Sequence, residues 1–101
     1  MDLSRNPFEE AGAAILAQAQ HKFPKLVRLN LSGCALGDRG VQVLPRWPSL
    51  LYLRVACNGI GDDGGRALGE AQLAGRWQLE CPGNRFKRGV KAALQKQGCK
   101  V

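Results

Sequence analysis

One pattern of apolar residues recurs along the chain, and it constrains the fold more than any other feature. It is complete in two segments, Leu26-x-x-Leu29-x-Leu31-x-x-Cys34-x-Leu36 and Leu50-x-x-Leu53-x-Val55-x-x-Asn58-x-Ile60. The second segment follows the first at a shift of 24 residues, and a glycine and a leucine follow each at equivalent places, Gly40 with Leu44 and Gly64 with Leu68. Such a period predicts stacked structural units that share one interior.

The register extends in both directions. It takes in an earlier copy at Leu3, Asn6, Phe8, Gly12 and Leu16, and a later copy at Leu79, Cys81, Asn84, Phe86, Val90 and Leu94. The Asn or Cys positions 6, 34, 58 and 84 are separated by 28, 24 and 26 residues. We therefore expect a single domain over residues 1–101, with units at approximately 1–25, 26–49, 50–73 and 74–101.

The spacing, followed by a glycine and an apolar helical stretch, resembles the leucine-rich repeats of the ribonuclease-inhibitor subfamily. The resemblance implies an α/β fold: a leucine-rich-repeat solenoid of about four strand-helix units, with a short parallel sheet on the concave side and helices on the convex side. It also implies a non-catalytic module for protein–protein interaction. The last copy departs from the pattern, with Arg76 in place of a leucine and Val90 in place of a glycine.

Alternation along each short strand places Leu29 and Leu31 inward and Asn30 and Ser32 outward. After the strand, the recurring Asn or Cys marks a bend at which a short side chain can bond to backbone groups that have no sheet partner. We expect these side chains to stack into one ladder, formed by Asn6, Cys34, Asn58 and Asn84.

Acidic residues stand just before or within the expected helices. Asp38 and Asp62 occupy equivalent places that suit helix N-caps, and Glu9 and Glu10 favour the positive end of the first helix. The segment 45–48, Pro-Arg-Trp-Pro, cannot continue a helix, so we expect a short convex turn in the second unit with Trp47 as hydrophobic filling.

Targeting patterns, cysteine content and net charge predict the cellular surroundings of the protein. The N-terminal segment shows no signal-peptide pattern, and no stretch approaches the roughly 20 apolar residues of a membrane span, which predicts a cytoplasmic protein without membrane contact. The four cysteines form no Cys-x-x-Cys pair, and we expect reduced thiols. The net charge of +7 favours encounters with acidic partners without naming one.

No pattern indicates an enzyme. Gly59-x-Gly61-x-x-Gly64 matches a dinucleotide-binding turn, with Glu80 about 20 residues on. However, Asp62 and Asp63 would place two negative charges where a pyrophosphate must lie, and the preceding unit has the same turn. We therefore expect no catalytic residue and no cofactor.

The remaining chemistry-bearing residues are His21 and the cysteines. His21, the only histidine, is expected in a loop, solvated or hydrogen-bonded. Cys34 lies in the ladder and Cys81 replaces an inward leucine, so small buried residues explain them better than metal ligands do, and we expect no metal site. Cys99, near the tail, is expected to be the exposed and oxidisable thiol.

Partner binding is expected on the concave face, where outward strand residues form columns. Tyr, Trp and Arg dominate interface energetics, so we expect Tyr52, Trp77, Arg28 and Arg54 as anchors. Trp77 has a second interpretation, as cover for the core of the last unit. The predicted partner-binding residues are Arg28, Asn30, Tyr52, Arg54, Trp77, Gln78 and Glu80.

The sequence leaves two further kinds of partner as alternatives, a nucleic acid or other acidic surface and a second copy of this chain. A basic cluster near the C-terminus predicts either nucleic-acid or acidic-surface binding through phosphate contacts, or simply the solvated face of a terminal helix. The incomplete first unit leaves a strand edge around Leu3 that could pair with another copy, giving a homo-oligomer. The basic cluster consists of Arg85, Lys87, Arg88, Lys91, Lys96 and Lys100.

Overall fold

The computed structural model describes residues 1–44, 49–75 and 77–101. Three short strands, β1 (Arg28–Asn30), β2 (Tyr52–Arg54) and β3 (Gln78–Glu80), form a parallel sheet in that order. Leu29 pairs with Leu53, and Leu53 pairs with Leu79. The register predicted from the repeat is therefore confirmed at its central positions.

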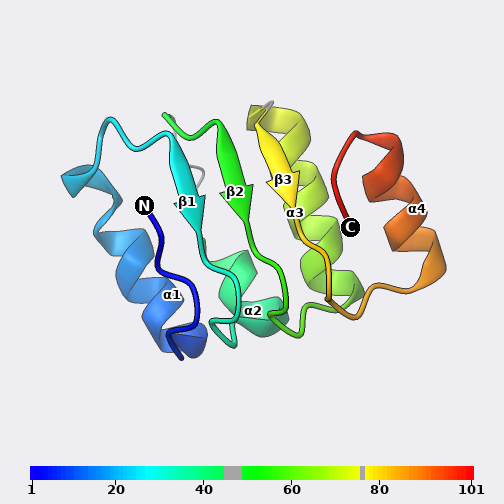
Figure 1. Cartoon of the computed structure of the whole chain (residues 1–101), viewed down its shortest axis with the longest axis horizontal. Helices are drawn as coiled ribbons and strands as arrows, with labels where there is room; N and C mark the ends of the chain where they lie inside the picture. The colour runs from blue at the N-terminus through cyan, green and yellow to red at the C-terminus, as the bar shows by residue number, and fades with distance from the viewer. Residues whose placement is uncertain (45–48, 76) are drawn as a thin grey trace.

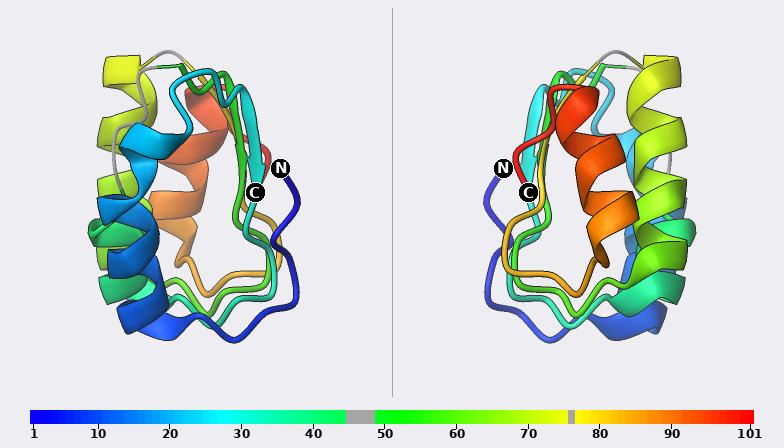
Figure 2. Two further views of the ribbon diagram at one scale, coloured as in Figure 1. Left: turned by 90° about the vertical axis from the view of Figure 1, so that its left-hand side faces the viewer. Right: turned by 90° about the vertical axis from the view of Figure 1, so that its right-hand side faces the viewer.

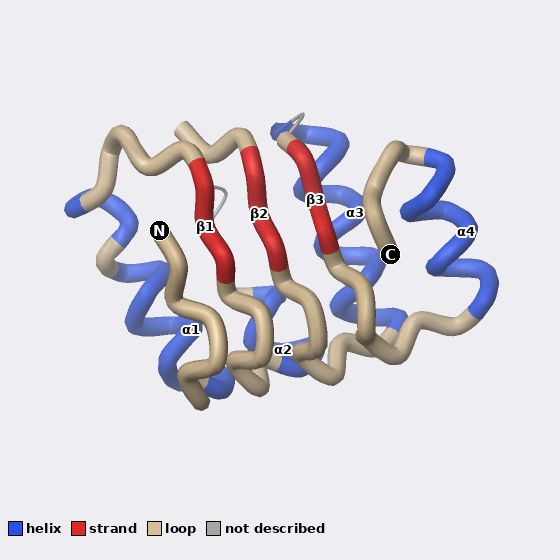
Figure 3. Tube along the Cα trace, viewed as in Figure 1, coloured by secondary structure: helices blue, strands red, loops and turns tan. Residues whose placement is uncertain are grey.

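The helices form a second layer on one side of the strands (Figures 1 and 2). Each strand is followed by a loop that crosses to this layer, as Figure 3 shows. The predicted arrangement of a short parallel sheet with helices on one face is confirmed. The elements of the helical layer are α1 (Glu9–Gln18), the 3₁₀ turn η1 (Gln20–Lys22), α2 (Gly37–Gln42), α3 (Asp62–Gly75) and α4 (Arg88–Lys96).

The space between the two layers is filled by the inward residues of the repeat. Leu29, Leu53 and Leu79 are at most 5% exposed. Burial of a large aliphatic side chain contributes about 1.5–3 kcal/mol, so this shared interior is the main stabilising feature. Other buried members are Leu31, Leu36, Val55, Ile60, Leu68, Cys81 and Leu94.

Chain ends cover both edges of the sheet, which is visible in Figure 1. Beside β1, Leu3 N donates to Asn30 O at 2.9 Å and Asn30 N donates to Met1 O at 2.9 Å. Beside β3, Cys81 N donates to the carbonyl of Lys100 at 2.7 Å. At the edge where we predicted self-association, the amide of Ser4 is bonded to the Asp2 carboxylate at 2.9 Å. The homo-oligomer stays a prediction.

The predicted ladder after the strands is confirmed. Asn58 Oδ1 accepts hydrogen bonds from the amides of Cys34 and Leu36, and Asn58 Nδ2 donates to the carbonyls of Leu31 and Ala56. Asn84 repeats this arrangement one unit on, toward the backbone of residues 55–60 and the Cys81 carbonyl. Each asparagine thus joins its own unit to the preceding one.

The predicted helix caps need a correction. Asp38 lies inside α2 and does not cap it. Its Oδ1 accepts from Gly61 N at 2.7 Å and Gly64 N at 3.0 Å, at the start of α3. Asp62 likewise accepts from Lys87 N at 2.8 Å, just before α4. Each acid stands in the first turn of its own helix and bonds to amides at the start of the next one, so it joins successive units.

The helix lengths differ between units. Helix α2 has 6 residues and α3 has 14, which confirms the short convex element predicted for the second unit. The proline-containing segment 45–48, and with it the prediction for Trp47, lies outside the described residues. Glu9 and Glu10 stand in the first turn of α1, as expected. Among the described residues, no helix is long and apolar enough to cross a membrane.

Candidate protein-binding surface

The face of the sheet turned away from the helices is uncovered in the two side views of Figure 2. Its side chains alternate with the buried leucines, so they point away from the interior. All are exposed or half-buried. We call this surface the open face; it consists of Arg28, Asn30, Tyr52, Arg54, Gln78 and Glu80. These are six of the seven predicted partner-binding residues.

At the start of the strands, the open face carries an aromatic ring with a cation above it. The guanidinium carbon of Arg28 lies 5.2 Å from the centroid of the Tyr52 ring. The register pairs Arg28 with Tyr52 and Tyr52 with Gln78, so the three side chains form one row. Stacking holds the Arg28 side chain extended over the ring and presents a flat, amphipathic contact.

At the end of the strands, a charged row crosses the open face. Glu80 Oε1 lies 3.6 Å from a guanidinium nitrogen of Arg54 and 3.6 Å from Lys100 Nζ. The Lys100 side chain is 79% exposed, so solvent and salt screen this pair strongly. The row therefore fixes charge positions on the surface more than it stabilises the fold.

Trp77 does not belong to this surface, which corrects the seventh predicted residue. Its side chain is 7% exposed and packs in the core. The residues at equivalent places, Val27 and Leu51, are 44% and 61% exposed. The difference arises because α3 is long enough to bring Gly75 against the indole. Trp77 covers the interior, the second interpretation that the sequence left open.

The prediction that Cys99 is the exposed thiol was wrong, whereas Cys34 and Cys81 are buried as predicted. Cys99 is buried, because the chain reverses at Gly98 (φ +88°) and the Cys99 amide bonds back to Leu94 O at 3.0 Å. Burial raises the pKa of the Cys99 thiol, and burial together with the neighbouring Cys99 raises the pKa of Cys81 to about 12. The exposed cysteine is Cys57, whose position immediately after buried Ala56 gave no signal in the sequence.

In the turn at residues 59–64, which matches a dinucleotide-binding motif, backbone amides are already hydrogen-bonded within the protein. The amides of Gly61 and Gly64, which a phosphate would need, already donate to Asp38.

His21 lies exposed in η1, and its Nδ1 is 3.0 Å from Gln18 O, as expected for a hydrogen-bonded surface histidine. Among the described residues, no group of three His, Cys, Asp or Glu side chains is placed to hold a metal ion.

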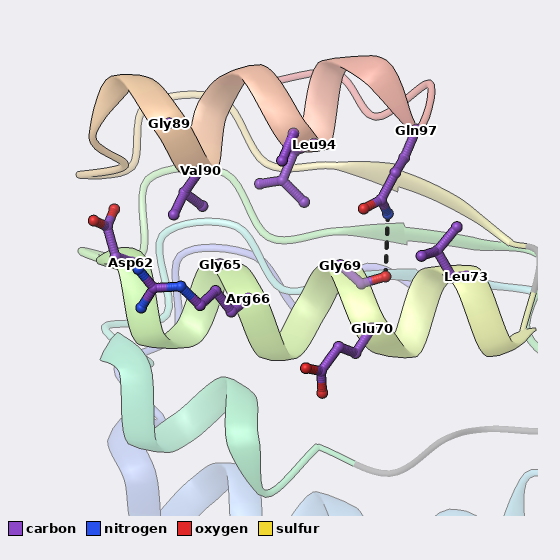
Figure 4. Close-up of a pocket in the computed structure, with 11 residues that line it drawn as sticks. Asp62, Gly65, Arg66, Gly69, Glu70, Leu73, Gly89, Val90, Leu94 and Gln97 are labelled. Carbon is purple, nitrogen blue, oxygen red and sulfur yellow. Dashed lines mark hydrogen bonds between the residues drawn. The ribbon is translucent and has the colours of Figure 1, made fainter.

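A groove of about 410 Å³ runs between α3 and α4. In Figure 4, Val90 and Leu94 of α4 point toward Gly65 and Gly69 of α3, and Gln97 Nε2 donates to Gly69 O at 3.1 Å. Those glycines are needed for close packing, since a Cβ on Gly65 would approach Val90 within 2.8 Å. The groove is thus a seam between packed helices.

A smaller hollow lies beyond the strand ends at the margin of the open face. Its volume is about 300 Å³. Asn30 and Arg54 belong both to it and to the open face, so the two surfaces are continuous. We call this hollow the turn pocket; it is lined by Ser4, Arg5, Asn30, Ser32, Gly33, Arg54, Ala56 and Cys57. The sequence analysis did not anticipate it.

Comparison with known proteins supports the repeat assignment. Residues 24–44 and 48–69 match the family model described as Leucine Rich repeat. Both segments contain the strand, the turn and the start of the helix described above. The matches support a leucine-rich repeat protein, a class of domain that is typically non-catalytic and commonly mediates protein–protein interaction. No curated protein matches the chain.

Proposed function

We propose that this chain is a non-catalytic binding module that holds a partner protein on the open face. The proposal includes a ribonuclease-inhibitor-like solenoid of about four units, in which chain segments 1–25 and 74–101 complete the array. The continuous parallel pairing from Asp2 through Asn30, Arg54 and Glu80, which stand at equivalent places in the four units, supports this arrangement.

The observation that carries the proposal is the Arg28–Tyr52 stack beside Gln78. These side chains lie on a rigid sheet, on the uncovered face, with Tyr52 half-buried and Arg28 exposed. Tyrosine and arginine are enriched among residues that dominate binding energy, because they bring large contact areas with little loss of conformational entropy. A partner protein that covers the stack would desolvate it completely.

The test is affinity capture followed by measured binding of the captured protein. We expect Tyr52→Ala and Arg28→Glu each to weaken binding about tenfold or more, corresponding to roughly 1.4 kcal/mol or more. Ile15→Ala is the matched control, because Ile15 is 67% exposed on α1 in the helical layer. Unchanged thermal unfolding shows that the variants are folded. Retained binding in both open-face variants, with loss in the Ile15 variant, would overturn the proposal.

A second candidate function rests on α4. Its basic residues are exposed, and in the described part of the chain none of those before Lys100 forms an ion pair. Lys87 and Arg88 stand at the start of the helix, where the Asp62 carboxylate already accepts from the Lys87 amide, so the support comes from the run of exposed cations along α4. This arrangement favours binding to the phosphates of a nucleic acid.

A gel shift with a generic duplex at two salt concentrations tests this second function. We expect binding at low salt that falls steeply at moderate salt, and a smaller salt dependence in Lys91→Gln. Tyr52→Ala, on the opposite layer, serves as the control and should bind as the unmodified chain does. Equal salt dependence in all three proteins would remove α4 as the site.

A further inference from the structure

The residue before each ladder position adopts a left-handed backbone conformation in all four copies of the repeat. The φ angles are +61° at Arg5, +67° at Gly33, +55° at Cys57 and +73° at Gly83. Glycine adopts this conformation without a steric penalty, whereas a residue with a side chain is strained there. Two copies thus use the residue that the backbone favours, and two retain a side chain at a cost in stability.

Of the four described non-glycine residues with a left-handed φ, Arg5 and Cys57 come together at one site, whereas Glu9 and Ala35 lie outside it. Arg5 and Cys57 belong to units two repeats apart, yet both line the turn pocket, with Gly33 between them. A Cβ built on Gly33 would lie 3.7 Å from Arg5 Cγ, so the arginine side chain runs close beside this glycine. A side chain kept where the backbone favours glycine is a feature of functional sites, and two such residues line this pocket.

The charges of the turn pocket select an anion. Arg5 and Arg54 bring two guanidinium groups, and no carboxylate is among the lining residues. One nitrogen of Arg54 lies 3.6 Å from Glu80, which leaves the other donors of its fork available. Asp2, near Ser4, is a second acid beside the pocket; its pKa is lowered mainly by hydrogen bonds from the hydroxyl and the amide of Ser4, and also by the charge of Arg5.

Uncharged donors complete the pocket. Ser32 Oγ accepts a hydrogen bond from Ala56 N at 3.1 Å, which orients the hydroxyl and leaves its proton without a described acceptor. Asn30 Oδ1 accepts from Ser32 N at 3.0 Å, and Asn30 Nδ2 donates to no described group. Two guanidinium groups with nearby neutral donors match the several acceptor positions of an oxyanion.

We propose that the turn pocket binds an oxyanion, a carboxylate or a phosphate monoester, presented by the partner protein that covers the open face. The identity of the partner rests on the proposed function above; the affinity of the pocket for the anion does not. At about 300 Å³ the pocket admits one side chain or one phosphate group. Arg5 and Arg54 neutralise it, and Gly33 leaves room for it between them.

Cys57 supplies a readout at the margin of the pocket, because it is a lining residue and the exposed thiol, with Sγ beside Gly83, and the other three cysteines are buried. The probes are inorganic phosphate and glutarate, each added at constant ionic strength. We expect phosphate or glutarate to slow alkylation of Cys57 by iodoacetamide several-fold. Whichever anion protects better identifies the source as a phosphate monoester or a carboxylate. An unchanged rate with both anions overturns the proposal.

Arg5→Gly is the decisive variant. It keeps the left-handed backbone and removes the guanidinium, so we expect the melting temperature to rise while protection by the anion weakens about tenfold, as loss of a charged hydrogen-bond donor predicts. Arg28→Ala is the matched control, since it removes the same charge from the open face outside the pocket. Equal weakening in both variants would show general charge attraction and overturn the site.

The two proposals fail in different ways. If Tyr52→Ala abolishes capture of the partner, but neither anion protects Cys57 and Arg5→Gly leaves capture intact, the pocket proposal fails and the proposed function stands. If the anions protect Cys57 but no open-face substitution alters capture, the proposed function fails, and the assignment of the oxyanion to a partner protein fails with it.

Discussion

Two rows of polar side chains cross the repeats at neighbouring positions, and they differ in almost every physical respect. The row after the strands is bonded to the backbone, at distances of 2.8 to 3.2 Å for its asparagines, and Asn58 in it is 3% exposed. The row at the strand ends is held by ion pairs of 3.6 Å, and its last member is 79% exposed. The first row is the turn ladder, Asn6, Cys34, Asn58 and Asn84; the second is Asp2, Asn30, Arg54, Glu80 and Lys100.

Recurrence with the repeat alone therefore does not distinguish a structural residue from a binding residue. Both rows recur with the period of the repeat. In the turn ladder, Asn58 and Asn84 satisfy backbone groups that have lost sheet partners, so their amide groups are used inside the molecule, whereas Asn6 is exposed. The row at the strand ends keeps unsatisfied charge on the surface, where a partner can reach it. Burial and hydrogen-bond satisfaction decide between the two roles.

The largest expected effect is on the buried side of this comparison. Asn58→Ala removes four hydrogen bonds and leaves the amides of Cys34 and Leu36 without acceptors. We expect a loss of about 3 kcal/mol or more in the free energy of unfolding, measured by urea denaturation. Asn6→Ala is the control, because Asn6 holds the same repeat position but is exposed and should cost under about 1 kcal/mol. Similar losses of unfolding free energy in both variants would show that burial does not decide how much a ladder asparagine stabilises the fold.

The acids that reach between units provide the next test. Asp38→Ala removes the acceptor of two amides at the start of α3, and we expect a loss of about 1–2 kcal/mol in stability together with faster amide exchange at Gly64. Asp63→Ala removes an equally charged side chain that is 77% exposed. That control should change stability by less than about 0.5 kcal/mol. Exchange that quickens in α2 instead would contradict the cross-unit cap.

The buried thiols sharpen the comparison through pH. Cys81 has its pKa raised from 9.0 to about 12, so the unfolded chain loses this proton first as pH rises. The contribution is fully present below pH 9 and is lost between pH 9 and 12, with a slope of at most about 1.4 kcal/mol per pH unit. We expect Cys81→Ala to flatten the alkaline part of the stability profile. Cys57→Ala, at the exposed thiol, should leave that part as steep as before.

The sequence predicted the features that depend on local alternation and period. Leu29, Leu53 and Leu79 were placed side by side because only a stacked sheet buries all three, and the asparagines were placed in a ladder because the backbone bend demands acceptors and donors. The features that the sequence did not predict depend on the lengths of the helices and on contacts made where the chain reverses. The length of α3 buries Trp77, and the reversal at Gly98 buries Cys99.

The turn pocket was missed for a related reason. Its lining comes from strand ends and loops of three successive units, and no single segment contains enough of it to form a motif. One signal was present, since Gly33 and Gly83 precede the ladder positions where Arg5 and Cys57 stand in the other copies. A glycine that is replaced by larger residues at an equivalent position indicates strain, and strain indicates a site worth examining.

The smallest expected effect lies on the exposed side. A double-mutant cycle with Arg54→Ala and Glu80→Gln should give a coupling free energy below about 1 kcal/mol, falling further in high salt, because the pair is 3.6 Å apart and the Arg54 side chain is 37% exposed. The measurement is urea unfolding of the two single variants and the double variant at low and high salt. A coupling free energy as large as the loss of unfolding free energy in Asn58→Ala would show that both rows stabilise the fold. The ion pair would then be structural, which would contradict a role of these charges in binding a partner.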